Sequence, residues 1–138
     1  FWIDKKTGLE CKLRADHINS DKQIVIDLKT TVDARLEAFT KSLANLKYHW
    51  QASHYLTGIS EITGIEHTEF VIIAIEKEPP YAIAVYRLDD AMIYLGGEEL
   101  KILLEEFRQC KEADQWPAYP VEIHSISMPE WYMKKANL

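Results

Sequence analysis

Two carboxylates and one lysine are placed along this chain where neighbouring strands of a sheet would bring them together. Asp27 and Lys29 lie in the apolar run Ile24–Thr31, and Asp16 precedes that run. Because side chains alternate along a strand, Asp27 and Lys29 share one face. The polar segment before the run is typical of a hairpin connection, and a turn centred on residues 21–22 pairs Asp16 with Asp27. The spacing therefore predicts a charged cluster on one side of a hairpin.

Facing carboxylates ordinarily repel each other across a pair of strands. A Mg²⁺ ion reverses that effect, since it binds one or two carboxylates and keeps water and substrate phosphate in its other positions. Lys29 would then orient or deprotonate a water molecule, or neutralise charge on a phosphate. The alternative is that Asp16 and Asp27 lie at a solvated sheet edge and that Lys29 only pairs with them. Taken alone, the spacing does not decide between these interpretations.

A further polar pair lies in the segment 48–56, which has the character of a helix. Gln51 and Tyr55 are one turn apart there and share a face. A glutamine offers a donor and an acceptor, and a tyrosine offers a hydroxyl and an aromatic ring, so both suit phosphate oxygens. The alternative is an ordinary amphipathic helix with Gln51 on its solvent side.

In this order, Asp16, Asp27-x-Lys29 and a helical Gln51-x-x-x-Tyr55 resemble the PD-(D/E)xK nucleases of the RecB-like branch. Ala15 precedes Asp16 where that family has Pro-Asp. The chain is also similar to a narrower family, the RecE-type exodeoxyribonuclease VIII nuclease domain of phage and prophage recombination systems. That similarity runs over nearly the whole chain and rests on the segments Cys11–Asp16, Asp27–Thr31, Tyr48–Gln51, Glu112–Pro117 and Met128–Trp131.

The resemblance implies a Mg²⁺-dependent exonuclease, with Mn²⁺ as an alternative cofactor, that degrades one strand of linear duplex DNA from its 5′ end. Such enzymes leave a 3′ single-stranded tail for a partner annealing protein. Related exonucleases form rings, so we expect a homo-oligomer of the full-length protein. The site residues that the resemblance implies are the metal ligands Asp16, Asp27 and the backbone carbonyl of Leu28, the catalytic lysine Lys29, and the completing pair Gln51 and Tyr55.

The family has one more metal ligand, an acidic residue or histidine on a helix upstream of the first long strand. This chain starts at Phe1, without a methionine, directly before a turn at Thr7-Gly8. We therefore expect a fragment that lacks its N-terminal helical part and that binds metal poorly. Glu10 does not substitute, because six residues along a strand separate it from Asp16 by roughly 20 Å.

Composition limits the class of protein. At 138 residues the chain fits a single nuclease domain, residues 1–138, with its own core. The longest strongly apolar run is too short to cross a bilayer, so no membrane role is expected. Two cysteines provide neither a disulfide framework nor an iron–sulfur ligand set, and a reducing cytoplasm is the simplest setting.

The net charge of −6 is unusual for a DNA-binding protein. Residues 1–55, however, carry nine Lys or Arg against seven Asp or Glu, whereas residues 56–138 carry seven against fifteen. A DNA-facing first half and an acidic back would reconcile the charge with the resemblance.

The order of elements predicts an α/β fold, a PD-(D/E)xK (restriction-endonuclease-like) core with a mixed β-sheet flanked by helices. The expected elements are hairpin strands at 8–16 and 23–29, a helical region at 34–62 broken near 45–47 and ended by Gly64, a strand at 70–77 covered on both faces, a strand at 81–88, and a helix from Asp89 or Asp90 to Ala113.

The sequence also makes predictions about the last helix and the tail that follows it. Gly96-Gly97 in the helix interior predicts either a close helix–sheet contact or a break. The tail Trp116–Leu138, with three prolines, is expected to wrap the domain irregularly. The residues of this helix expected to point inward are Leu100, Leu103, Leu104 and Phe107.

Two other functions fit the same residues. A non-catalytic nuclease-like module would only bind DNA or a recombination partner, although such a module has no need for opposed carboxylates. A sequence-specific endonuclease would share the site and would cut closed-circular DNA. His49 could contact phosphate near Gln51, but a partly buried surface histidine is the simpler interpretation.

Overall fold

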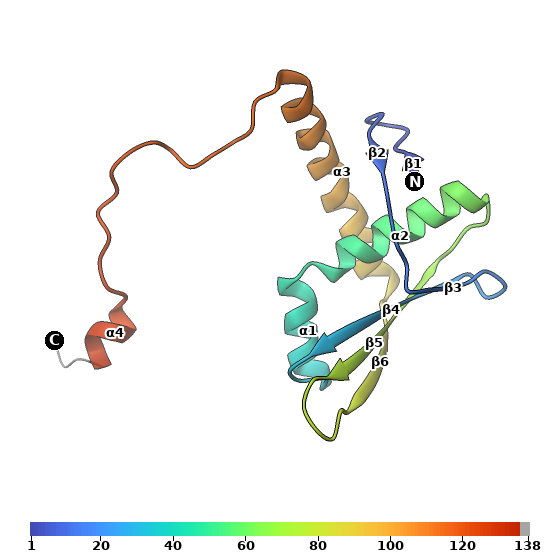
Figure 1. The fold of residues 1–138 in the computed structure, drawn as a ribbon, viewed down its shortest axis with the longest axis horizontal. Coiled ribbons are helices and arrows are strands. Elements are labelled where there is room, and N and C mark those ends of the chain that lie inside the picture. Colours follow the sequence, from blue (N-terminus) through green and yellow to red (C-terminus); the bar gives the residue numbers. More distant parts are fainter. Residues whose placement is uncertain (136–138) are drawn as a thin grey trace.

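The structure, a computed structural model, describes residues 1–135. It contains two small sets of strands and four helices, and the predicted α/β class with a mixed sheet is confirmed (Figure 1). The elements in chain order are β1 (Trp2–Ile3), β2 (Glu10–Cys11), β3 (His17–Asn19), β4 (Ile24–Thr31), α1 (Leu36–Asn45), α2 (Tyr48–Thr63), β5 (Glu69–Glu76), β6 (Ile83–Arg87), α3 (Asp90–Ala113) and α4 (Glu130–Lys135).

The main sheet has the strand order β3-β4-β5-β6. β4 and β5 are parallel and are joined by the crossover helices α1 and α2, whereas the outer pairs are antiparallel. β3 pairs with β4 so that His17 lies opposite Ile26 and Asn19 lies opposite Ile24. This is the register expected from a turn at residues 21–22, so that prediction is confirmed.

The first predicted strand, residues 8–16, was wrong in its bounds. Only Glu10 and Cys11 are extended there, and they pair with β1 in a separate two-stranded sheet. Asp4 closes that small hairpin, because its carboxylate accepts hydrogen bonds from the Thr7 N–H and hydroxyl at 2.8 and 2.7 Å. Residues 12–15 are irregular, and β3 begins at His17, inside the segment expected to be the connection.

The core lies between one face of the main sheet and the helices. Val25 of β4 and Phe70 and Ile72 of β5 are fully buried, and they meet apolar side chains of α1 and α2. The buried cluster consists of Val25, Ala34, Phe39, Leu43, Ala52, Leu56, Ile59, Phe70, Ile72, Ala74 and Leu88.

The opposite face of the sheet is more open than predicted. β5 was expected to be covered on both faces, but its residues alternate between buried and half-buried along most of the strand. Leu28, Ile83 and Val85, which point away from the helices, are more than half exposed. The unbroken β-branched run therefore indicated a strand but overestimated its burial.

The helical region 34–62 divides where the sequence predicts. α1 ends at Asn45, and Lys47 adopts a left-handed conformation with φ of 56° before α2 begins. Gly64 ends α2 with φ of 70°, a conformation that a glycine adopts without a steric penalty.

α3 runs unbroken from Asp90 to Ala113, and the Asp89 carboxylate caps it by accepting from the Met92 N–H at 2.7 Å. The glycine pair marks a close contact, but with α2 rather than with the sheet. A methyl group on Gly96 would overlap the His49 carbonyl, and one on Gly97 would lie 2.9 Å from the Ser53 hydroxyl oxygen.

The apolar stripe predicted to point inward from α3 is only partly covered. Leu100 and Leu104 are half-buried, but Leu103 and Phe107 are exposed, so the prediction is wrong for these two residues. Phe107 does contact Trp116, with ring centroids 5.3 Å apart.

The tail does not wrap the domain. After α3 the chain extends away from the sheet, and α4 lies at its far end (Figure 1). All residues from 115 to 135 are exposed. Residues 136–138, which the prediction also included, lie outside the described residues. No helix within residues 1–135 is both long and apolar enough to span a bilayer.

Candidate active site

Asp27 and Lys29 occupy adjacent same-face positions near the middle of β4, as their spacing predicts. Both side chains point toward the helices, so Asp27 is buried and Lys29 is largely so. The Lys29 Nζ lies 2.5 Å from Asp27 Oδ2 and forms an ion pair with it. A buried carboxylate needs such a partner, because removing a charge from water is costly when no opposite charge replaces the solvent.

Gln51 joins these two groups from the other side. It lies in the first turn of α2, where its amide nitrogen donates to Asp27 Oδ1 at 2.9 Å and its carbonyl oxygen accepts from Lys29 Nζ at 2.7 Å. The amide thus has its donor toward the carboxylate and its acceptor toward the ammonium, which is the only orientation that satisfies both. The three residues predicted from two separate motifs form one connected cluster.

Asp16 lies at the edge of β4 rather than in a strand. It immediately precedes β3, and its Oδ2 accepts a hydrogen bond from the Leu28 backbone N–H at 2.8 Å. Extending the register of β3 and β4 by one pair places Asp16 opposite Asp27. The Asp16 side chain is exposed, whereas the Asp27 side chain is enclosed, so the two carboxylates differ in access to solvent.

Tyr55 does not join the cluster through any hydrogen bond or ion pair found within residues 1–135. Its ring packs edge-on against Phe70, with centroids 6.3 Å apart, and contributes to the core. Tyr48, which the sequence reasoning missed, lies closer to the charges, since Lys29 Nζ sits 4.7 Å from the centre of its ring. The sequence feature that could have identified Tyr48 was its position three residues before Gln51, on the same helix face.

His49 and Trp50 face α3 instead of the cluster. Glu99 accepts a hydrogen bond from the Trp50 indole N–H, and its Oε2 lies 3.0 Å from His49 Nε2. The hydrogen bond from Trp50, followed by that from His49, lowers the pKa of Glu99 below its usual range. His49 is buried, so the suggestion that it contacts phosphate is not supported, and it is more enclosed than the surface histidine expected.

The donors around Asp27 suit a hard divalent cation. Asp27 Oδ2 is buried, and among residues 1–135 the Lys29 ammonium at 2.5 Å is its partner, while Gln51 binds Oδ1. The Leu28 carbonyl faces the same edge as its N–H, where Asp16 lies, because both groups of a strand residue point to the same neighbour. Two carboxylates and a carbonyl are oxygen ligands of the kind that Mg²⁺ takes.

Further ligands are not supplied by the described residues. Between residues 1 and 135, no group of three or more His, Cys, Asp or Glu side chains gathers closely enough to hold a metal. A cation bound by Asp16 and Asp27 would therefore keep water or substrate oxygens in its remaining positions, as Mg²⁺ commonly does.

A comparison with protein-family models matches residues 1–128 to the family described as PDDEXK-like domain of unknown function (DUF3799). The chain belongs to this family. The PDDEXK-like assignment agrees with the mixed sheet flanked by helices and supports the nuclease superfamily, and it does not extend to the narrower RecE type. A comparison with curated proteins gave no match.

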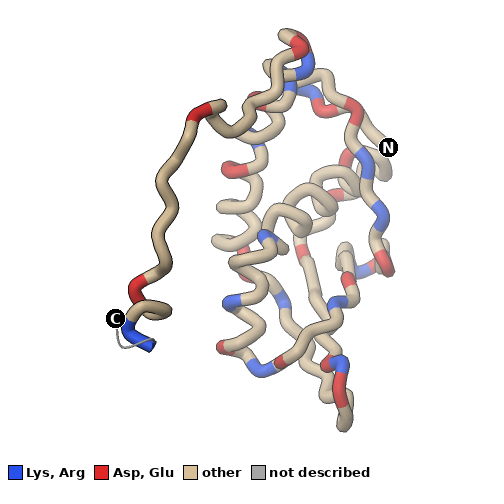
Figure 2. The backbone as a smooth tube through the Cα atoms, turned by 60° about the vertical axis from the view of Figure 1, so that its left-hand side comes forward, with Lys and Arg blue, Asp and Glu red and all other residues tan. Residues whose placement is uncertain are grey.

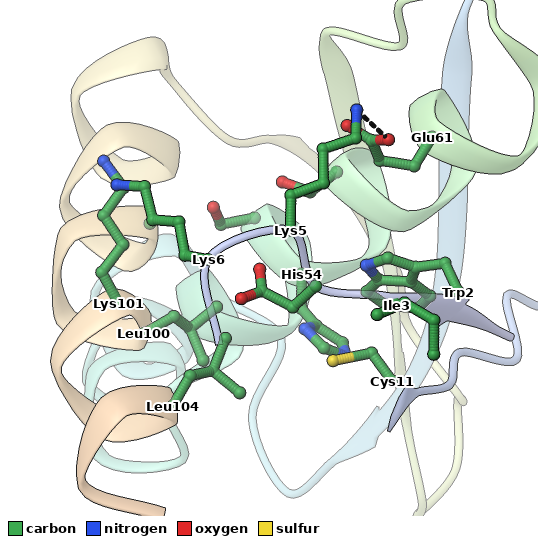
Figure 3. A pocket seen from close by; sticks show the side chains of 14 residues that line it. Trp2, Ile3, Lys5, Lys6, Cys11, His54, Glu61, Leu100, Lys101 and Leu104 are labelled. Atoms are coloured by element: carbon green, nitrogen blue, oxygen red, sulfur yellow. Dashed lines mark ion pairs between the residues drawn. The ribbon is translucent and has the colours of Figure 1, made fainter. Parts of the chain in front are cut away.

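A cavity of about 260 Å³ in this PDDEXK-like chain lies apart from the cluster. Figure 3 shows Cys11 of β2 beside His54 of α2, with Leu100 and Leu104 of α3 across the cavity. Lys5 and Glu61 form an ion pair at 2.6 Å. Burial lowers the pKa of His54 and raises that of Cys11, which favours the neutral form of each side chain. None of the predicted site residues lines this cavity.

Basic and acidic positions are interspersed along the PDDEXK-like chain (Figure 2). They do not separate into one basic and one acidic side in this view. The expected division into a DNA-facing first half and an acidic back therefore stays a prediction that rests on the residue counts.

Proposed function

We propose that this PDDEXK-like chain is the nuclease part of a Mg²⁺-dependent exodeoxyribonuclease that degrades one strand of linear duplex DNA in the 5′ to 3′ direction. The observation that carries the proposal is the Gln51 amide between Asp27 and Lys29. A carboxylate, a lysine and an amide joined in this way use buried polar groups that packing alone does not require. Membership in the PDDEXK-like family supports phosphodiester chemistry for them.

Each residue has a role that follows from its position. Asp16, Asp27 and the Leu28 carbonyl would hold Mg²⁺, which supplies charge stabilisation to a phosphodiester when bound. Lys29 pairs with Asp27 and would offer its positive charge to a phosphate oxygen or an attacking water. Gln51 accepts a hydrogen bond from the Lys29 ammonium and so helps to hold it beside Asp27.

The finer parts of the proposal come from the resemblance to RecE-type exonucleases. These parts are the exonuclease mode, the strand polarity, and the supply of 3′ tails to a single-strand annealing protein. They rest on the segments that carry the resemblance, among them Asp27–Thr31 and Tyr48–Gln51. A homo-oligomer and a cytoplasmic location belong to the same proposal.

Digestion of linear duplex DNA by the full-length protein tests the proposal. With Mg²⁺ present, Lys29→Ala should slow degradation by about 10²- to 10⁴-fold, the usual contribution of a positioned acid–base group. Lys41→Ala is the matched control, because Lys41 is an exposed lysine on α1 that pairs with none of the site residues. Closed-circular DNA should remain intact, and chelation of the metal should stop the reaction.

Equal rates for the wild type and Lys29→Ala would remove the enzyme hypothesis. Cutting of closed-circular DNA would replace the exonuclease with an endonuclease that uses the same residues. Unequal release of label from 5′-labelled and 3′-labelled ends measures the polarity directly.

A non-catalytic DNA-binding or partner-binding module is the second candidate. It is favoured by the lack of a third metal-ligating side chain near Asp16 and Asp27 within residues 1–135. This candidate predicts that the wild type retards linear duplex DNA in a gel without shortening it, with either Mg²⁺ or Mn²⁺ present.

A further inference from the structure

The start of α2 lacks the local features that usually fix a helix end. Lys47 occupies the N-cap position in a left-handed conformation, and no side chain caps the helix there. Most helix starts use a Ser, Thr, Asp or Asn side chain to satisfy the free N–H groups of the first turn. Gln51 nevertheless makes two directed contacts from this turn. The orientation of the turn must therefore be set by contacts from elsewhere.

Besides the packing of the buried Ala52 and Leu56 in the core, Glu99 of α3 provides two such contacts. Its carboxylate accepts from the Trp50 indole N–H and lies 3.0 Å from His49 Nε2, so it binds two consecutive residues of the α2 start. A charged acceptor makes stronger hydrogen bonds than a neutral one. The pKa of Glu99 is lowered by these same contacts, first by Trp50 and then by His49, so the carboxylate is charged at neutral pH.

The backbone of α3 passes close enough for this contact because of Gly96. No side chain separates Gly96 from the His49 carbonyl, and an added methyl group would overlap that oxygen. Glu99 lies three residues further along α3, on the same side of the helix. Gly96 and Glu99 are one turn apart on α3, and both therefore contact residues 49–50 of α2.

We propose that Glu99 is a positioning residue that sets the rotation of the first turn of α2 and thereby holds the Gln51 amide between Asp27 and Lys29. One residue corresponds to about 100° around a helix, so anchoring positions 49 and 50 determines where position 51 points. Within residues 1–135, Glu99 makes no hydrogen bond or ion pair with Asp27, Lys29 or Gln51, so it acts through the helix. The rate effect of this residue rests on the proposed nuclease function, whereas its structural effect does not.

The kinetic experiment compares Glu99→Ala, Glu99→Gln and Glu98→Ala in the digestion of linear duplex DNA. Glu99→Ala should lower kcat by about 10- to 100-fold with little change in KM, since a small misplacement of a reacting group has effects of this size. Glu99→Gln retains an acceptor for Trp50 and should restore most of the rate. Glu98→Ala is the matched control, because within residues 1–135 Glu98 pairs only with Lys101 at the surface.

A double-mutant cycle separates positioning from a general loss of structure. In a Gln51→Ala background, Glu99→Ala should have no further effect on kcat, because the group that it positions is already absent. An equal fall in both backgrounds, or an equal fall for Glu98→Ala, overturns the proposal.

The structural experiment follows the side-chain amide signal of Gln51 by NMR, identified by its loss in Gln51→Ala. Glu99→Ala should shift both this signal and the Trp50 indole signal, and Glu98→Ala should leave both unchanged. Trp50→Phe removes the indole donor to Glu99 and tests the same link if Glu99→Ala fails to fold. An unshifted Gln51 amide signal in these variants overturns the proposal, whether or not the wild type has nuclease activity. A lack of nuclease activity in the wild type would by itself remove only the proposed function.

Discussion

The two halves of α3 have similar apolar content but different surroundings. In the first half, Met92 and Ile93 pack against the core, Gly96 touches α2, and Glu99 binds it. In the second half, Ile102, Leu103 and Phe107 are exposed. The periodicity of a helix decides which residues share a face, but the presence of an element opposite that face decides whether they are buried. The first half of α3 therefore helps to position the site through its contacts with α2, and the second half does not.

The largest effect is expected at the contact that brings the two helices together. Gly96→Ala should destabilise the fold by about 3 kcal/mol, because an added methyl group overlaps backbone that cannot move aside as a side chain can. Chemical denaturation measures this difference. A glycine in an open helix would instead gain about 1 kcal/mol from replacement by alanine, so a stabilised variant would contradict the close contact.

A matched pair of isoleucines within α3 tests the difference between its halves. Ile93→Ala should cost about 2 kcal/mol, since Ile93 packs against the core. Ile102→Ala should change the unfolding free energy by less than about 0.5 kcal/mol, because Ile102 is exposed. The gain in helix propensity is the same in both variants and cancels. Equal losses in urea denaturation would mean that the second half is covered in solution.

The smallest effect concerns the pH dependence of the contact made by Glu99. Its pKa lies below the ordinary value of 4.5 in the folded state, so the contact stabilises the fold above that pH and is lost as the pH falls through the lowered value. The difference in unfolding free energy between the wild type and Glu99→Gln should shrink as the pH falls below 4.5.

Denaturant midpoints on both sides of that pH measure this difference. The other titratable groups beside Glu99 are His49 and Lys47 at the start of α2, and they are unchanged in the comparison. A difference that grows on acidification would mean that the carboxylate is not held in its charged form.

Much of the site could be predicted from local spacing. Alternation along a strand placed Asp27 and Lys29 on one face, and the hairpin turn set the register that brings Asp16 to the edge beside them. Helical spacing placed Gln51 in α2, although only the crossover packing directed it to the cluster. Tyr55 followed the same helical rule and yet turned into the core against Phe70.

The contact made by Glu99 could not be predicted in this way. Glu99 and Trp50 are separated by forty-nine positions in the chain, and neither residue type nor periodicity indicates which distant helix will lie opposite. The exposure of Leu103 and Phe107 has the same cause, because an apolar stripe predicts a buried face only where another element covers it.

The sequence by itself therefore determined the α/β class, the break before α2, the glycine at its end, and the strand face that carries Asp27 and Lys29. These features depend on backbone preferences and side-chain alternation within a few residues. Tertiary structure alone decided how Gln51 meets that pair, how Glu99 anchors the helix start, and which half of α3 is covered. Those outcomes depend on how closely two helix backbones approach, and a glycine sets that distance only after the chain has folded.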